Sequence, residues 1–488
     1  MHVGSHSEFE TNGLLEPNQH LPPKRLASLD FQRGLAIWIM TLMHTFEHLY
    51  DYTWVKEDPE KILDLPLPVL IIGLIVGFFL SWHSYFLFIS AVVNTLSMTK
   101  RTIVHDDSSK ILAKQAITGV GILTAGFLSD GFGYNGYFGL ALRTGDWTNY
   151  QPIYQYFFTM HTLRIIGWCL IINSLVTYFL IRKKGYLKYI RNMIVYGVLA
   201  IVIIILSPFI HNFVDGLHWL IPENPPPGIS DNTKWPSVYF QTHNASVKAW
   251  ICSLLAGDME PLFPYLATSF AGSMIGLTLA KPKPVKRLPL IGGLSGLGIM
   301  GIGVIFFAFG FYNLSNGRPS IGNFLAILGS QIAVMMLLLW LIEYRGKGEK
   351  FANNPIIKHF RLWGMASLTI YCFQILEILP RWLLTLILKL TPNPVNLLDS
   401  GVFGYAKEYL AILVAIFCIA FFEAGVFLWS QVNFRFSFEW LIVKLSTLGS
   451  KQTSNRLNVN LILNEVDWIS YKPKVEAKSL PTKKSIQS

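Results

Sequence analysis

Hydrophobic residues dominate ten stretches of the chain, each about as long as a bilayer is thick. These stretches lie at about 32–50, 68–95, 111–130, 160–181, 187–210, 260–280, 288–312, 321–343, 364–389 and 405–430. An α-helix needs roughly 20 mostly apolar residues to cross the hydrocarbon core of a membrane. The pattern therefore predicts an all-α, polytopic membrane protein with about ten transmembrane helices.

Basic residues alternate between the loops that join these stretches. Lys and Arg are dense at 100–114, 182–191, 281–287 and 345–361, whereas the longer loops between these segments carry few. Loops rich in Lys and Arg usually remain in the cytoplasm. The alternation therefore predicts that both termini are cytoplasmic.

The two ends of the chain differ from its apolar body. Residues 1–25 are polar and lack the apolar core and the small-residue cleavage site of a signal peptide, so we expect a flexible cytoplasmic tail. Residues 431–488 are mixed and basic, and we expect a second cytoplasmic tail at the membrane surface. Residues 26–430 form the predicted transmembrane domain.

The composition argues against an ordinary soluble protein. Only 14% of the residues are charged and 52% are hydrophobic, whereas soluble domains carry about 25% charged residues. The net charge of +11 is interpreted as an effect of cytoplasmic loops, and no nucleic-acid-binding motif is present. The four cysteines form no C-x-x-C pair and are interpreted as packing residues.

Two predicted extracytoplasmic loops, 131–159 and 211–259, are rich in aromatic residues. They include Trp147, Tyr150, Tyr154, Trp219 and Trp235. Such residues are typical of an aromatic belt at the membrane interface. They could also form a platform on which a polar acceptor, such as a sugar, stacks its apolar face.

Ionisable residues inside an apolar stretch are costly, and the first stretch holds the most. They are Asp30 and Arg33 at its predicted cytoplasmic end, followed by His44, Glu47, His48 and Asp51 toward the other end. The last four share one helical face. Arg33 precedes His44 by close to three turns, so both project from nearly the same side, about 16 Å apart along the axis. One stripe of this helix thus combines a cation with a candidate general base.

Other ionisable residues are predicted to lie on the same side of the membrane as His44 and His48. They are Asp130, His161, Arg164, His211, Asp215, His218, Asp258 and Glu260, whereas His83 falls near the middle of the second stretch. A single histidine at a helix end is commonly a hydrogen-bonded interface residue. Several histidines close to carboxylates favour a general base instead.

A metal site on the first stretch was considered as an alternative. His44 and His48 stand four residues apart with Glu47 between them, which is a spacing that can hold a metal ion. Such a site normally needs a third ligand, and the spacing of other residues identifies none. We therefore expect no metal.

A family resemblance is carried by the segment Arg25-Leu-Ala-Ser-Leu-Asp30-Phe-Gln-Arg33-Gly34. It resembles the opening of the heparan-α-glucosaminide N-acetyltransferase family and its prokaryotic relatives, whose first span follows a Ser-Leu-Asp-x-x-Arg-Gly pattern. The spacing from Arg33 to His44 is also similar to that of membrane acyltransferases that acetylate bacterial surface polysaccharides. Weaker similarities lie at 163–167, 261–266 and 364–371.

The chain departs from that family in two places. Animal members carry their essential histidine in the loop after the first span, and residues 52–67 contain none, which leaves His44 and His48 as candidates. The motif in the ninth span often continues to a histidine, where this chain has Phe373 and Gln374.

The resemblance implies an enzyme that moves an acyl group from cytosolic acetyl-CoA to a hydroxyl or amine, such as that of a glycan, on the far side. In this hypothesis Arg33 foremost, with Asp30 and Arg164, binds CoA. His44 or His48 acts as the base or accepts the acyl group, and Asp51, Glu47 or another acidic group orients it. The expected partners are the lipid bilayer of the cell membrane, acetyl-CoA and the acceptor, with a homodimer also allowed.

A secondary transporter or lipid flippase is the alternative interpretation. The same histidines and carboxylates would then form a proton relay. An internal repeat would favour a transporter, and we find no convincing repeat. Stabilisation of the protein by CoA would distinguish the two functions.

Overall fold

The computed structural model describes residues 25–54, 59–62, 64–68, 70–71, 84–105, 108–134, 136–148, 160–217, 247–257, 260–281, 285–309, 318–447 and 457–471. These residues form helices joined by short connections and contain no strand, only two isolated β-bridges. The predicted all-α class is confirmed. The expected tails at 1–24 and 472–488 lie outside the described residues.

The longer helices account for most of the structure. They are α1 (Ala27–Leu49), α4 (Tyr85–His105), α5 (Ser108–Phe132), α7 (Thr162–Ile181), α8 (Tyr189–Asp215), α11 (Leu262–Leu279), α12 (Leu288–Ala308), α13 (Ile321–Leu339) and α18 (Glu408–Ser430). Shorter helices are α6 (Tyr137–Thr144), α10 (Val247–Ala256), α14 (Gly348–Ala352), α15 (Pro355–Met365), α16 (Ser367–Cys372), α17 (Ile378–Leu388) and α19 (Phe438–Ser446). Single turns of 3₁₀- or π-helix lie at Pro59–Ile62, Gly185–Leu187, Trp340–Tyr344, Gln374–Glu377 and Leu461–Glu465.

Seven segments of the described chain are long and apolar enough to cross a membrane. They are Ser108–Thr144, Thr162–Ile181, Tyr189–Asp215, Leu262–Leu279, Leu288–Phe306, Ile321–Tyr344 and Glu408–Ser430. The chain is therefore a membrane-embedded helical protein. Helix α1 is long enough but falls outside this set, because its polar stripe lowers its mean hydropathy.

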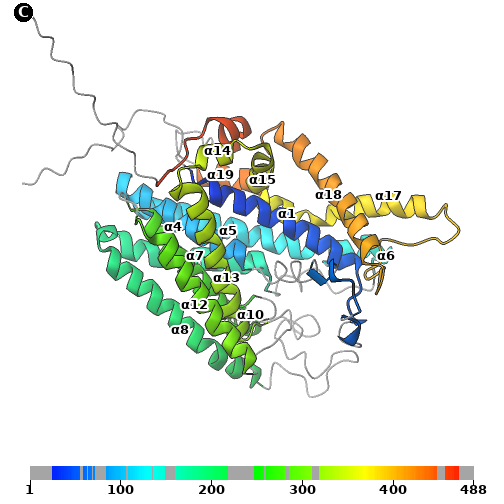
Figure 1. Cartoon of the computed structure of the whole chain (residues 1–488), viewed down its shortest axis with the longest axis horizontal. Helices are drawn as coiled ribbons and strands as arrows, with labels where there is room; N and C mark the ends of the chain where they lie inside the picture. The colour runs from blue at the N-terminus through cyan, green and yellow to red at the C-terminus, as the bar shows by residue number, and fades with distance from the viewer. Residues whose placement is uncertain are drawn as a thin grey trace, which may run out of the picture.

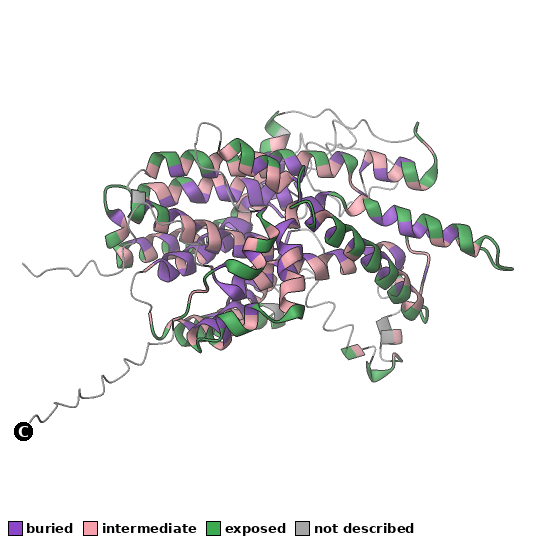
Figure 2. Cartoon of the chain, turned by 90° about the horizontal axis from the view of Figure 1, so that it is seen from above, coloured by how far each residue is buried: buried purple, intermediate pink, exposed green. Residues whose placement is uncertain are grey.

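The bundle has a buried centre and apolar outer helices. Helix α11 is the most enclosed span, with 83% of its apolar window buried, and it packs against α4 and α8. Only 11% of the apolar stretch of α8 and 17% of that of α12 are buried inside the protein. Their outer faces are therefore left for lipid. Figure 2 shows exposed residues on the outer faces and buried residues toward the middle. Figure 1 shows α8, α12 and α13 on one side of the bundle and α17 projecting from the other.

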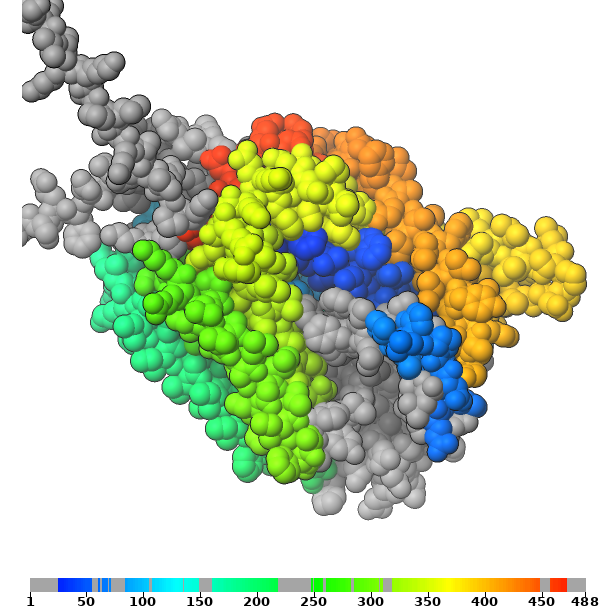
Figure 3. Space-filling model, viewed as in Figure 1, coloured from blue at the N-terminus to red at the C-terminus, as the bar shows by residue number. Residues whose placement is uncertain are grey.

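Helix α1 crosses α15 at Gly34, and the two backbones nearly touch. A Cβ atom built at Gly34 would lie 1.6 Å from the carbonyl oxygen of Phe360. Only glycine allows this approach, which also fixes the direction in which the polar stripe of α1 faces. Figure 3 shows part of α1, in dark blue, between the yellow-green segment around α15 and the orange helix α18.

Replacing Gly34 by alanine is expected to destabilise the fold by about 1–3 kcal/mol, because one backbone must move away from the other. The matched control is Gly425→Ala in α18, where an added Cβ would meet no atom within 4 Å. That control should be neutral or slightly stabilising, since alanine favours a helix. Thermal unfolding of the two purified variants in detergent measures the difference. Equal stabilities would contradict the close crossing.

The predicted ninth stretch, 364–389, is not one helix. It begins inside α15, restarts as α16, makes a 3₁₀ turn at Gln374–Glu377 and continues as α17. The backbone leaves the helical region at Ala366 and again at Phe373. Helix α16 starts anew because Glu439 of α19 accepts hydrogen bonds from the backbone N–H groups of Leu368 and Thr369, which cap its first turn.

The second stretch also differs from its predicted bounds. Helix α4 begins at Tyr85 and continues to His105, ten residues beyond the predicted end, so Lys100 and Arg101 lie in the helix rather than in a loop. Residues 72–83 of this stretch, including His83, lie outside the described residues.

The described part of the C-terminal region packs against the bundle. Backbone hydrogen bonds of 2.9 Å join Arg25 to Asp467 and Ile469, in a parallel bridge centred on Trp468. Tyr471 donates its backbone N–H to the carbonyl oxygen of Glu343. These contacts tie the segment 457–471 to the start of α1.

Candidate functional site

The polar face of α1 meets the interrupted segment that follows α16. The Nδ1 atom of His48 lies 2.8 Å from Oε1 of Glu377, and the hydroxyl of Thr45 donates to Oε2 of the same carboxylate at 2.9 Å. One turn earlier, Nδ1 of His44 lies 3.0 Å from Oε1 of Gln374. The two histidines therefore have different partners, a carboxylate for His48 and an amide for His44.

Glu377 also forms a buried ion pair with Arg381. Nη1 of Arg381 lies 2.8 Å from Oε1 of Glu377, and the two side chains are 0% and 1% exposed. The remaining donors of Arg381 bind the carbonyl oxygens of Leu397 and Asp399, at 2.7 and 3.0 Å. A buried charge needs such partners to be tolerated. The loop after α17 thus positions Arg381, and Arg381 in turn forms the ion pair with Glu377.

Tyr134 completes the cluster from the loop between α5 and α6. Its ring stacks on the imidazole of His48, with centroids 3.7 Å apart and an interplanar angle of 14°. Its hydroxyl accepts hydrogen bonds from Nη1 of Arg381 at 2.6 Å and from Nη1 of Arg143 at 3.2 Å. Stacking on one side and Glu377 on the other fix the orientation of His48.

The end of α1 is held by the loop that precedes α18. The backbone N–H of Gly401 donates to the carbonyl oxygen of His48 at 3.1 Å, and Phe403 donates to Leu49 at 3.0 Å. Gly401 has φ +65°, a conformation that favours glycine. The loop therefore adds a second restraint on His48, through its backbone.

Neither of the two acidic residues expected to orient the base contacts it. Asp51 accepts hydrogen bonds from the backbone N–H and the hydroxyl of Thr53, at 2.9 and 2.7 Å, which lower the pKa of its carboxyl. Glu47 forms no hydrogen bond or ion pair with either histidine in the described structure. The carboxylate that holds the imidazole is Glu377 instead.

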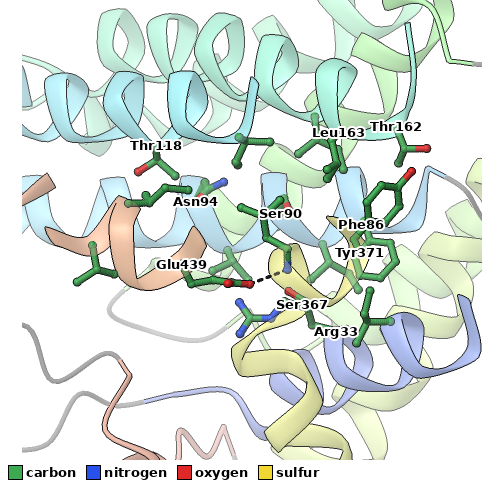
Figure 4. Close-up of a pocket in the computed structure, with 18 residues that line it drawn as sticks. Arg33, Phe86, Ser90, Asn94, Thr118, Thr162, Leu163, Ser367, Tyr371 and Glu439 are labelled. Carbon is green, nitrogen blue, oxygen red and sulfur yellow. Dashed lines mark hydrogen bonds between the residues drawn. The ribbon is translucent and has the colours of Figure 1, made fainter. Parts of the chain in front are cut away.

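Arg33 lines a cavity of about 150 Å³ enclosed by α1, α4, α5, α7, α16 and α19. Its polar lining consists of Arg33, Ser90, Asn94, Thr118, Thr162, Ser367, Tyr371 and Glu439, and the other lining residues are mainly apolar. Figure 4 shows Arg33, Ser367 and Glu439 close together, with Tyr371 and Thr162 toward one end and Thr118 and Asn94 toward the other.

Arg33 brings a guanidinium group to this cavity, and Glu439 brings a carboxyl group. Asp30 is paired with Arg25, at 2.8 Å, and the Nε atom of Arg33 is buried without a hydrogen-bond partner among the described residues. Glu439 accepts from the hydroxyl of Thr369 at 2.6 Å and caps α16, and burial raises the pKa of its carboxyl. The cavity thus presents a guanidinium group that can bind an anionic or strongly polar ligand.

The cavity stops short of the two histidines. Neither His44 nor His48 lines it, whereas Tyr371 does and lies three residues before Gln374, the partner of His44. Arg33 and His44 both face the segment that contains Ser367 and Gln374, as their spacing predicts. The two parts of the site therefore border one segment, the cavity at Ser367–Tyr371 and the histidines at Gln374 and Glu377.

Other predicted site residues have structural partners or lie outside the description. Nη2 of Arg164 lies 2.6 Å from Oδ2 of Asp130, so this arginine joins α7 to α5 instead of facing a free phosphate site. His211 contacts the carbonyl oxygen of Phe263 at 2.8 Å. Three further predicted residues are placed by the structure: Asp215 forms an ion pair with Arg318, Glu260 is buried, and His161 directly precedes α7. His218, Asp258, Tyr150, Tyr154, Trp219 and Trp235 lie outside the described residues.

Glu377, Arg381, Tyr134 and Arg143 were not identified from the sequence. The first two could have been, because they are charged residues four apart within a predicted apolar stretch, the criterion applied to the first stretch. The other two lie in the predicted loop 131–159, which has no spacing that would place their side chains, although Arg143 belongs to helix α6 in the structure. In the described part of the chain, no group of three His, Cys, Asp or Glu side chains is placed to hold a metal ion.

Comparison with known proteins adds no assignment. No protein-family model matches the chain, and no curated protein matches it.

Proposed function

We propose that the chain is a membrane acyltransferase that moves an acetyl or longer acyl group from CoA to a hydroxyl or amine of an acceptor such as a glycan. The observation that carries the proposal is the pairing of His48 with Glu377, on the face of α1 that also bears Arg33. An imidazole held by a buried carboxylate is suited to general-base chemistry near neutral pH. Arg33 supplies a cation for the donor.

His48 would act as the base through its Nε2 atom. A carboxylate only accepts hydrogen bonds, so the Nδ1 atom that faces Glu377 carries the proton and Nε2 is free to accept another. As the acceptor oxygen or nitrogen attacks the thioester carbonyl, Nε2 takes its proton. The C–S bond then breaks, and the proton passes to the thiolate of CoA. Acceptor and acyl-CoA thus give acylated acceptor and CoA, and His48 returns to its starting state.

The donor would reach this base along the cavity beside Arg33. The mainly apolar lining, with amide and hydroxyl groups from Asn94, Ser90 and Thr118, suits an acyl-pantetheine arm. Arg33 would pair with a phosphate or polar group of CoA. The segment from Tyr371 to Gln374 lies between the lining of the cavity and the partners of the histidines, and it would have to move for the thioester to reach His48. The backbone of Phe373, which lies in this segment, is non-helical.

This proposal also assigns a topology. Helix α1, helix α4 and the interrupted segment 367–388 would cross the membrane together with the seven apolar segments, which gives ten crossings with both termini in the cytoplasm. An interrupted crossing is tolerated where its free backbone groups find partners inside the protein. Glu439 supplies such partners at the start of α16.

Acetyl-CoA is expected to raise the thermal stability of the purified protein, because a ligand that binds only the folded state stabilises it. Arg33→Gln should weaken this effect at least tenfold in acetyl-CoA concentration, since a charge-assisted contact contributes about 1.5–3 kcal/mol. Arg182→Gln is the matched control, with an exposed arginine that lies on aromatic rings at the end of α7. Absence of any shift in the unaltered protein would contradict the proposal. An equal response in Arg33→Gln would remove the role of that residue.

A secondary transporter or flippase is a second candidate, favoured by one observation. Transporters often bind their substrates at discontinuous membrane helices, and the segment 367–388 is discontinuous beside the buried pair Glu377 and Arg381. The same thermal measurement separates the two functions. Stabilisation by acetyl-CoA supports the enzyme, whereas proton-driven uptake by vesicles containing the protein, without that stabilisation, would support the transporter.

A further inference from the structure

Arg143 presents an unused guanidinium edge next to the proposed base. Its Nη1 atom is committed to the hydroxyls of Tyr134 and Ser400, at 3.2 and 2.7 Å. In the described part of the chain the hydrogen bonds of this guanidinium are those of Nη1, and its Nε atom is buried without a partner. The Nε and Nη2 groups of an arginine lie on one edge and donate two parallel hydrogen bonds, which match the two oxygens of a carboxylate or phosphate.

Arg143 shares its tyrosine partner with a second arginine. Arg143 and Arg381 both bind Tyr134, and only one carboxylate, that of Glu377, is paired within the cluster. The two nearby acidic side chains are otherwise occupied, Asp51 by Thr53 and Asp399 by Asn396. No described carboxylate forms an ion pair with Arg143. Two arginines therefore share one paired carboxylate in this cluster.

The edge lies within reach of the reaction that we propose. The guanidinium carbon of Arg143 lies 4.0 Å from the centroid of the Tyr134 ring, on which His48 also stacks at 3.7 Å. These two distances put the centre of the imidazole and the guanidinium carbon at most about 8 Å apart. A ligand of a few bonds could contact both.

We infer that Arg143 forms an oxyanion-binding site, and that the acceptor carries a phosphate group separated by several bonds from the group that is acylated. This inference rests on the proposed function for the identity of the ligand as an acceptor. A soluble molecule and a lipid headgroup can each bear this anion, and the chemistry of recognition is the same. Tyr134 and Ser400 hold Nη1, so the free edge is oriented before the ligand binds.

The test measures binding, so it does not depend on finding the acceptor. Thermal unfolding of the purified full chain is followed with methyl phosphate, with dioctanoyl phosphatidic acid and with dioctanoylglycerol as the neutral counterpart. We expect stabilisation by at least one of the two phosphate compounds and none by dioctanoylglycerol. Arg143→Gln should need at least ten times more of the phosphate compound for the same shift, and Arg182→Gln should respond as the unaltered protein does.

The outcomes divide clearly. A response to phosphatidic acid alone identifies a lipid-borne acceptor, and a response to methyl phosphate identifies a soluble one. No response to either, or an equal response in Arg143→Gln, overturns the inference. Arg143→Lys, which keeps the charge but loses the two-donor edge, should also weaken binding and serves if the glutamine variant does not fold. A normal shift with acetyl-CoA shows that a variant is folded, and it also reports separately on the proposed enzyme.

Discussion

Replacing Glu377 by glutamine is expected to destabilise the protein by about 3–5 kcal/mol, because Arg381 would keep its charge in a buried site with no carboxylate to balance it. The change removes few atoms, so packing contributes little to the loss. Thermal or denaturant unfolding in detergent measures the effect. Glu349→Gln is the control, since this exposed residue lies in α14 and should change stability by less than about 0.5 kcal/mol.

A double variant separates the ion pair from the proposed chemistry. Glu377→Gln combined with Arg381→Met removes both charges, and replacing a buried ion pair by neutral or apolar groups often restores stability. We expect most of the lost stability to return. Acyl transfer should stay low in the double variant, because His48 still lacks its carboxylate. Full recovery of turnover together with stability would show that Glu377 serves only the fold.

Two features could be predicted from the sequence because both follow from periodicity. They are the membrane class and the face of α1 that carries Arg33 and His44. Apolar stretches mark spans, and a spacing of 11 residues puts Arg33 and His44 on one helical face, where both meet the segment 367–374. This much requires only the geometry of a single helix. It does not require knowledge of which helices are neighbours.

The interruption of the ninth stretch could not be predicted in the same way. Residues 364–389 are as apolar as a continuous span, and the break depends on Glu439, about 70 residues later, which supplies the cap for α16. The partner of His48 depends on the same long-range arrangement. Nearby Glu47 and Asp51 are the closest carboxylates in the sequence, yet Glu377 is the one that the fold brings to the imidazole.

Arg143 and Tyr134 depend on tertiary contacts even more strongly. Tyr134 lies in the connection after α5 and Arg143 in the short helix α6, and their positions follow from contacts with Arg381 and Ser400, which come about 250 residues later. The sequence around them does not indicate which distant residues their side chains meet. The sequence identified the loop as a candidate for acceptor binding through its aromatic residues, but not through the arginine.

His48→Ala is expected to lower the rate of acyl transfer by about 10²–10⁴-fold while leaving stabilisation by acetyl-CoA intact, since the base is lost and the cavity is not. His44→Ala is the closest comparison. Its imidazole faces the amide of Gln374 in place of a carboxylate, so we expect less than a tenfold loss. His211→Ala, which alters a contact with Phe263, controls for general effects of histidine removal. Release of CoA thiol in the presence of a panel of sugar, amine and lipid acceptors provides the assay.

The comparison of the two histidines decides which part of the stripe is catalytic. A loss confined to His48→Ala agrees with a base oriented by Glu377, because only that imidazole has a buried carboxylate at 2.8 Å. A larger loss in His44→Ala would instead assign the base to the histidine nearer the cavity, with Gln374 as the group that orients it. Undiminished transfer in both variants would contradict histidine catalysis in this chain. In that case the Arg33 cavity would have to bind a ligand for which no imidazole is needed.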